Sequence, residues 1–215
     1  MTAPPRRTIG LIAAPREDVC LDFVNTRCWR GRDTPTEELH GIDDLLAWTA
    51  GTGGADTPAV GACATQWRAH PREASAAFAS AIALRETLFR LFAAVASHEA
   101  TKPGDLAVLN AALSAAAPRS RMALRDGRFV WSAETARPGM AALLSPVLWS
   151  TSDLLAGPRR ERVRQCANPQ CRWVFLDDSK SGNRRWCSMA ACGNRAKAHR
   201  HYLKRRDATH QEGRA

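Results

Sequence analysis

Four cysteines near the C-terminus constrain the fold of this chain more than any other feature. They form two pairs, Cys166 with Cys171 and Cys187 with Cys192, in the pattern Cys-x4-Cys-x15-Cys-x4-Cys. Zinc binds four ligands at tetrahedral corners, with Zn–S distances of about 2.3 Å. Each pair can fold back on one turn and supply two ligands. The spacing therefore predicts one structural Zn²⁺, because four thiolates leave no open coordination position.

Other interpretations of the cysteines stay open. The four could be buried and unrelated, whereas a redox pair is disfavoured because both spacings differ from Cys-x-x-Cys. His199 and His201 could compete as ligands, but they lie further along the chain and we expect them at the surface or in an interface. The scattered Cys20, Cys28 and Cys63 are expected to be buried small apolar residues.

The residues around the pairs predict a treble-clef-like finger. Residues 173–176 read as a strand, 177–183 as a turn, and Ser188 as the cap of a helix that reaches about residue 206. A module of about 50 residues is too small to be stable on its core alone, so zinc would supply much of its folding free energy. Gly193-Asn194 interrupts this helix. Either Asn194 caps its true start, or Gly193 permits close approach to the zinc sulfurs.

The net charge is concentrated in the same region. Residues 157–215 hold 15 Lys and Arg against 5 Asp and Glu, which accounts for the whole net charge of +10. A neutral N-terminal part joined to a basic module is typical of proteins that bind a polyanion. Gly157-Pro158 marks the change, and we place the boundary there, with an N-terminal domain at 1–156 and a C-terminal module at 157–215.

Cations on and just before the C-terminal helix could contact phosphates, release counterions and read guanine edges. The ordinary alternative is a solvated helix face. The density of charge beside a metal-held module favours nucleic acid, with duplex DNA as the expected partner. The candidate residues are Arg184, Arg185, Arg195, Lys197, Arg200, Lys204 and Arg205. An RNA-binding or protein-interaction module, whose finger docks a partner, is the alternative.

The N-terminal domain reads as mainly helical, with one small β-hairpin around Asp126-Gly127. Residues 18–26 fit a strand or a helix equally well. Loops are expected at 1–16 and 51–62. Helices are expected at 41–50, 73–97, 103–117 and 138–156, the last with a break near Pro146. The predicted fold class is therefore α+β, mainly helical, with a treble-clef-like zinc finger at the C-terminus.

Three polar residues stand among apolar neighbours in the first compact segment: Asp22, Asn25 and Thr26. They could form the polar corner of a pocket for a small-molecule effector. The simpler interpretation is that they cap a helix or close a turn. The sequence contains no recognisable nucleophile–base set and no phosphate-binding glycine motif, so we do not expect an enzyme.

Two stretches resemble a known bacterial architecture. Trp173-Val-Phe-Leu-Asp, Arg184-Arg-Trp-Cys-Ser-Met and Cys192-Gly-Asn-Arg-Ala-Lys together are similar to the CGNR zinc finger across residues 166–206. Cys20-Leu-Asp-Phe-Val-Asn-Thr26 resembles the opening motif of the ABATE domain that accompanies this finger. The resemblance implies a stress-induced transcriptional regulator with a DNA-binding finger.

The remaining expectations concern location and assembly. No apolar run reaches the ~18 residues that a membrane-spanning helix needs, and the N-terminus carries no secretory signature. We therefore expect a cytoplasmic protein that does not bind membranes. A finger this small would bind specific DNA only with help, which makes a homodimer plausible.

Overall fold

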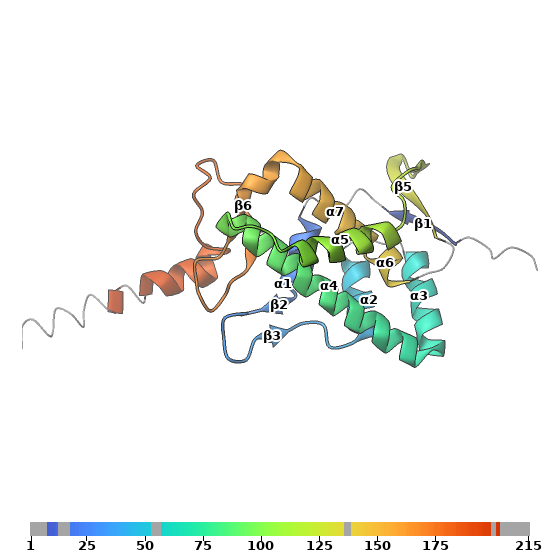
Figure 1. Cartoon of the computed structure of the whole chain (residues 1–215), viewed down its shortest axis with the longest axis horizontal. Helices are drawn as coiled ribbons and strands as arrows, with labels where there is room; N and C mark the ends of the chain where they lie inside the picture. Colours follow the sequence, from blue (N-terminus) through green and yellow to red (C-terminus); the bar gives the residue numbers. More distant parts are fainter. Residues whose placement is uncertain (1–7, 13–17, 53–56, 136–138, 199–200, 203–215) are drawn as a thin grey trace, which may run out of the picture.

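The structure, a computed structural model, describes residues 8–12, 18–52, 57–135, 139–198 and 201–202 (Figure 1). It confirms the α+β, mainly helical fold class. The α-helices described in the N-terminal domain are α1 (Val19–Asn25), α2 (Ile42–Gly51), α3 (Thr57–Ala69), α4 (Pro71–Ser97), α5 (Pro103–Ala115), α6 (Met140–Leu143) and α7 (Ser145–Ala156). None of the helices described is both long and apolar enough to cross a bilayer.

Helix α4 crosses the molecule and forms the centre of its core (Figure 1). Pro71 stands in its first turn, where the missing N–H is no loss. His98 ends the helix in the left-handed conformation, with φ at 56°. Leu88 and Phe92 are fully buried on the face that meets the neighbouring helices. The predicted helix over 73–97 is thus confirmed.

Helix α1 resolves the ambiguity of residues 18–26. It packs against α4, α7 and a strand of the C-terminal module, so that Cys20, Phe23 and Val24 have no exposed surface. A helix that is covered on most of its sides lacks the 3.6-residue hydrophobic period of an amphipathic helix, because its apolar residues are not confined to one face. For this reason the sequence pattern could not separate helix from strand.

Two sequence expectations are wrong. The loop predicted over 51–62 is wrong over residues 57–62, because α3 begins at Thr57 and carries Pro58 in its first turn, where proline is tolerated. Residues 1–16 are not entirely a loose lead-in, because β1 (Thr8–Ile12) pairs antiparallel with β5 (Arg128–Thr135). Thr8 pairs with Thr135, and no local pattern reports a partner so far along the chain.

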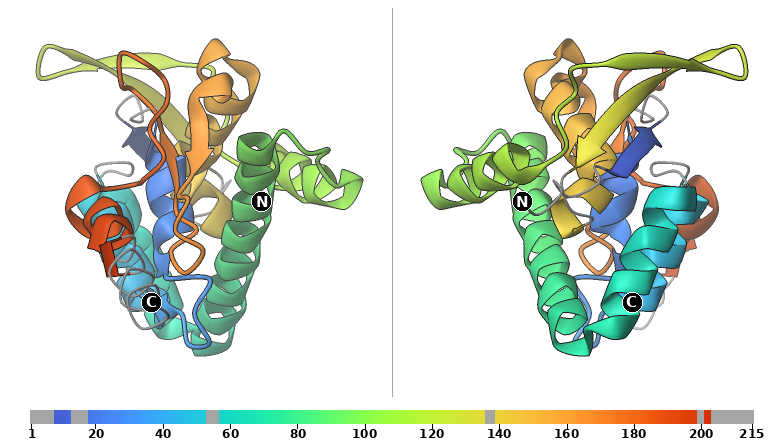
Figure 2. Two further views of the ribbon diagram at one scale, coloured as in Figure 1. Left: turned by 90° about the vertical axis from the view of Figure 1, so that its left-hand side faces the viewer. Right: turned by 90° about the vertical axis from the view of Figure 1, so that its right-hand side faces the viewer.

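The predicted hairpin is confirmed. β4 (Met122–Arg125) and β5 meet at Asp126 and Gly127, whose φ angles of 50° and 74° match a type I′ turn. The sheet order is β1-β5-β4, and the hairpin extends away from the helices as an arm (Figure 2). The expected break near Pro146 falls at Leu144, between α6 and α7.

The C-terminal module is built onto this core. A 3₁₀ turn, η1 (Pro158–Arg162), leads into the antiparallel pair β6 (Val163–Gln165) and β7 (Val174–Leu176). Val163, Val174 and Leu176 belong to the same buried cluster as the residues of α1 and α4. The first hairpin of the C-terminal module therefore shares its hydrophobic core with the N-terminal domain.

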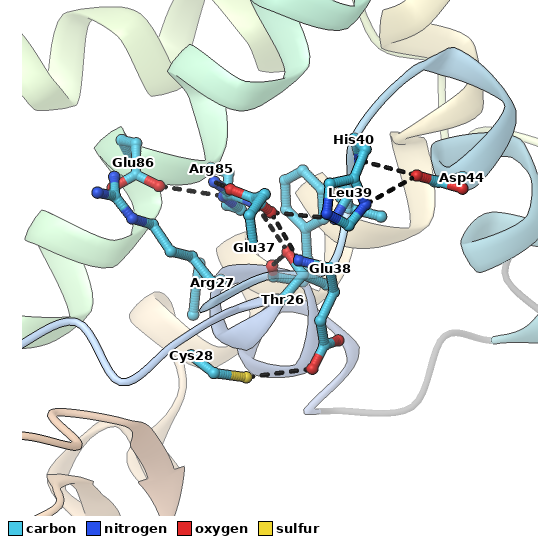
Figure 3. A network of polar contacts seen from close by, with 12 residues as sticks. Thr26, Arg27, Cys28, Glu37, Glu38, Leu39, His40, Asp44, Arg85 and Glu86 are labelled. Carbon is cyan, nitrogen blue, oxygen red and sulfur yellow. Dashed lines mark hydrogen bonds and ion pairs between the residues drawn. The ribbon is translucent and has the colours of Figure 1, made fainter. Parts of the chain in front are cut away.

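A buried ion-pair network ties the short strands β2 (Arg27–Cys28) and β3 (Thr36–Glu37) to α4 (Figure 3). The Arg85 side chain is fully buried and donates two hydrogen bonds to the Glu37 carboxylate, at 2.5 and 2.6 Å. It also bonds Glu86, which in turn accepts from Arg30 at 2.6 Å. Burial alone would raise the pKa of Glu37. The hydrogen bonds and charge of Arg85, together with hydrogen bonds from the backbone N–H groups of Glu38 and Leu39, outweigh burial and lower that pKa.

Replacing Arg85 tests this network. We expect Arg85→Met to lower the free energy of unfolding by about 1 to 3 kcal/mol, because it leaves the half-buried Glu37 carboxylate without the guanidinium that it pairs with. The lowered pKa of Glu37 implies stability that is present above its unfolded pKa and is lost as the pH falls through its folded pKa. This acid-dependent part should shrink in the variant. Urea titrations between pH 7 and 3 measure both effects.

The control is Arg72→Met, which removes an exposed arginine from the same helix. A surface substitution of this kind changes stability by less than about 0.5 kcal/mol. Equal losses in the two variants would contradict the structural role of Arg85.

Candidate metal centre and cationic surface

The four paired cysteines come together at one point. Their sulfur atoms all lie within 4.8 Å of one another, with 3.6 Å between Cys171 and Cys187 and 3.8 Å between Cys187 and Cys192. Tetrahedral zinc with Zn–S bonds of about 2.3 Å places neighbouring sulfurs about 3.8 Å apart. The donor set and its spacing therefore fit one structural zinc ion.

The first pair lies on a tight turn before β7. The Cys171 N–H donates to the Asn168 carbonyl at 2.9 Å, which closes the turn expected from Asn168-Pro169. The Asn168 side chain accepts from the Gln170 N–H at 3.0 Å and donates to the Cys192 sulfur at 3.6 Å. Asn168 thus connects the turn of the first pair with the second pair.

The second pair lies at the start of a helix. Ser188 caps it, accepting from the Ala191 N–H at 3.3 Å, as predicted. The first turn, η2 (Met189–Gly193), is π-helical, and the helix continues through Asn194, which has helical dihedral angles. Asn194 is therefore not the cap. A Cβ at Gly193 would lie 2.7 Å from the Met189 sulfur, so this glycine permits close packing against Met189 rather than against the zinc ligands.

Four thiols this close cannot all ionise without a cation. The Cys187 thiol donates to Cys171 and lowers the pKa of Cys171 to about 5. The same contact raises the pKa of Cys187, and burial raises the pKa of Cys192 to about 11. A divalent cation bound by all four sulfurs would require them as thiolates, so its binding would release protons.

Arg184 stabilises the module from within. Its guanidinium donates to the carbonyls of Trp186, at 2.8 Å, and Cys187, and it lies 4.7 Å from the centre of the Phe175 ring. The backbone N–H of Arg184 donates to the buried Asp177 carboxylate at 2.8 Å. Arg184 was predicted to contact phosphate, but in the structure its guanidinium donates to backbone carbonyls of the module itself.

Residues of the N-terminal domain complete the junction with the C-terminal module. The Asn25 amide donates to the Val174 carbonyl at 2.8 Å and accepts from its N–H at 3.2 Å. Thr26 accepts from Arg85 at 3.1 Å and donates to the Phe23 carbonyl at 2.8 Å. Asp22 is half-buried on α1. The polar atoms of Asn25 and Thr26 are thus engaged in structural contacts, and the effector pocket at these residues stays a prediction.

A cleft of about 560 Å³ opens on the C-terminal module between the turn 167–170 and the helix at 192–196. Arg185 and Arg195 line it, and Trp186 and Cys192 form part of its wall. No carboxylate is found among its described lining residues. Two other clefts contain carboxylates, Asp43 in one and Asp105 in the other. We call the cleft between 167–170 and 192–196 the cationic groove.

The remaining sequence candidates are placed as follows. Lys197 is exposed on the helix, and so is His201, while the four cysteines form the cluster without a histidine among the described residues. Outside the described residues lie His199, Arg200, Lys204 and Arg205. Cys20 and Cys63 are buried as expected, but Cys28 is only half-buried, because its thiol faces the exposed Glu38 carboxylate at 3.1 Å.

Sequence reasoning missed the loop after β2, where Trp29 packs against the cysteine cluster. The signal that could have identified it is a tryptophan followed within three residues by two arginines, in Trp29-Arg-Gly-Arg32.

Comparison with known families agrees with this geometry. Residues 17–158 match the ABATE family, described as "Putative stress-induced transcription regulator". The chain belongs to the ABATE family. Residues 162–205 match the CGNR zinc finger, which covers all four cysteines. The search among curated proteins finds no match. One family is thus described as regulatory and the other as a zinc finger, and neither as an enzyme.

Removing one ligand tests the metal centre. We expect Cys171→Ser to lose the single zinc ion that the native chain retains after dialysis, because three thiolates and a hydroxyl bind zinc more weakly. Unfolding of the whole chain should shift to lower temperature, since the hairpin beside the metal lies in the shared core. Metal analysis and calorimetry measure both. In the control Cys63→Ala zinc should stay at one per chain, and zinc loss in both variants would argue against this ligand set.

The junction gives a second prediction. Asn25→Asp is isosteric, but it cannot donate to the Val174 carbonyl and sets a negative charge against that oxygen. We expect a loss of about 2 to 4 kcal/mol in the free energy of unfolding, comparable to Asn25→Ala, because buried backbone groups lose their partner. Urea denaturation measures it. An Asn25→Asp protein as stable as the native chain would show that the junction does not depend on this amide.

Proposed function

We propose that the chain is a zinc-dependent transcription regulator of the bacterial cytoplasm that binds duplex DNA through its C-terminal module. The observation that carries the proposal is the cationic groove, in which two arginines face a cleft without carboxylates beside the zinc site. In the described part of the chain, neither Arg185 nor Arg195 forms an ion pair. Their charge is therefore available to a phosphate.

Both guanidinium groups lie over aromatic rings. Arg185 lies 5.6 Å from the centre of the Trp186 ring, and Arg195 lies 4.6 Å from the centre of the Trp29 ring. Stacking uses the face of the guanidinium and leaves the N–H donors at its edge for hydrogen bonds to phosphate. A side chain held in advance also loses less conformational entropy on binding.

The groove gives a physical reason for zinc dependence. One of its walls is the turn between Cys166 and Cys171, and the opposite wall is the helix that carries Cys192. A tetrathiolate zinc joins these two walls directly. Without the metal, the distance between Arg185 and Arg195 would no longer be fixed, and the groove would no longer match the spacing of DNA phosphates.

A second candidate is the binding of unpaired nucleic acid, RNA included. It is favoured by one observation, that Trp186 and the exposed Gln170 both line the groove, because aromatic rings stack on unpaired bases and amides pair with their edges. A small-molecule effector and a homodimer are compatible with either candidate.

Fluorescence anisotropy with duplex DNA over a series of salt concentrations tests the proposal. We expect Arg185→Ala and Arg195→Ala, which remove the two arginines that line the groove, each to weaken binding and to reduce the slope of log K against log salt by about 0.9, the value for one phosphate contact. Removal of zinc with a chelator should abolish binding. Lys180→Ala is the control, since this exposed lysine of the same module does not line the groove.

The proposal is contradicted if all three variants bind duplex DNA with the same affinity and slope as the native chain. Tighter binding of single strands or structured RNA at every salt concentration would favour the second candidate instead.

A further inference from the structure

The loop between β2 and β3 reaches from the N-terminal domain onto the C-terminal module. The Gly31 N–H donates to the Gln170 carbonyl at 3.1 Å. A Cβ at Gly31 would lie only 1.9 Å from the Pro169 carbonyl oxygen, so no side chain fits there. Pro169 and Gln170 also line the cationic groove. The loop therefore lies directly against one wall of that groove.

Trp29 connects the loop to both walls. Its ring packs against the cluster formed by the zinc cysteines and Phe175. The backbone of Trp29 is in the left-handed region, with φ at 53°, a conformation that costs about 1 to 2 kcal/mol for a residue other than glycine. Such a conformation persists only where the surrounding contacts hold it.

Two arginines from different parts of the chain lie over this one ring. The Arg32 guanidinium lies 4.0 Å from the ring centre, and that of Arg195 lies 4.6 Å from it. The two charges are therefore closer than about 10 Å, one Debye length at ~0.1 M salt, and they repel each other. Arg32 is exposed and, like Arg195, has no ion-pair partner among the described residues. An anion bound beside both would relieve the repulsion.

The loop is also fixed from behind, which distinguishes Arg32 from an arginine on a free loop. Arg30 donates to the Glu86 carboxylate of α4 at 2.6 Å and to the Val24 carbonyl at 2.8 Å. Its guanidinium lies 3.9 Å from the centre of the Phe89 ring. The segment that carries Arg32 is thus anchored to the core of the N-terminal domain.

We propose that the nucleic-acid surface is composite: Arg32 of the ABATE domain binds the phosphate backbone together with Arg195 of the zinc finger, and Trp29 positions both. This inference rests on the proposed function and extends it to a residue outside the finger. Arg195 belongs both to the cationic groove and to the pair of arginines at Trp29, so the two cationic sites are continuous. Nucleic acid is the expected occupant because its repeating phosphates can contact both sites at once.

Anisotropy with duplex DNA and the zinc-loaded full chain tests the composite surface. We expect Arg32→Ala to raise the Kd roughly three- to tenfold near 0.1 M salt and to reduce the salt slope by about 0.9. Arg32→Lys, which keeps the charge but loses the planar stack, should keep the slope and bind with intermediate affinity. Should the alanine variant unfold more readily, Arg32→Gln provides the same charge removal with a longer side chain.

The matched control is Arg68→Ala. Arg68 is an exposed arginine of α3, a helix of the same domain that lies at the opposite end of the molecule from the finger (Figure 1). Its loss should change Kd by less than twofold. If Arg32→Ala and Arg68→Ala bind DNA equally well, the composite surface is wrong while the proposed function stands. If the native chain itself does not bind nucleic acid, the proposed function fails first.

Discussion

The meeting of four sulfur atoms within 4.8 Å is the contact on which the rest of the C-terminal module depends. One pair stands on a turn before β7, and the other stands at the start of a helix. Among the described residues, two hydrogen bonds also join these pieces: the Ala167 N–H donates to the Arg185 carbonyl at 2.9 Å, and the Asn168 amide donates to the Cys192 sulfur at 3.6 Å. A metal that binds all four sulfurs therefore sets the distance between the walls of the cationic groove.

The same cluster is joined to the N-terminal domain by contacts of different kinds. Val174 lies in the main core and pairs with the Asn25 amide, while Gly31 meets the turn of the first cysteine pair without room for a side chain. Burial, hydrogen bonding and steric fit thus act at one junction. The two segments of the chain that match separate families therefore share one hydrophobic core. Trp29 of the N-terminal domain also touches the C-terminal helix, because its ring centre lies 4.6 Å from the Arg195 guanidinium.

Local chemistry explains which features the sequence could predict. The cysteine spacing, the Ser188 cap and the Asp126-Gly127 turn each depend on residues within a few positions of one another. The strand β1 and the role of Asn25 depend on partners more than a hundred residues away, which no local pattern reports. The sequence predicted Arg184 as a surface cation that contacts phosphate. In the structure its guanidinium donates instead to a carbonyl of the module, that of Trp186. The metal site was predictable because its ligands come in close pairs, whereas the Arg32 contact depends on how the two parts pack.

Zinc X-ray absorption on the native full chain, purified under reducing conditions, tests the central claim most directly. The account predicts one zinc per chain with four sulfur neighbours at about 2.3 Å and no nitrogen or oxygen in the inner shell. A chain that contains no zinc, or a spectrum that requires a histidine nitrogen or a water oxygen among the ligands, would contradict it.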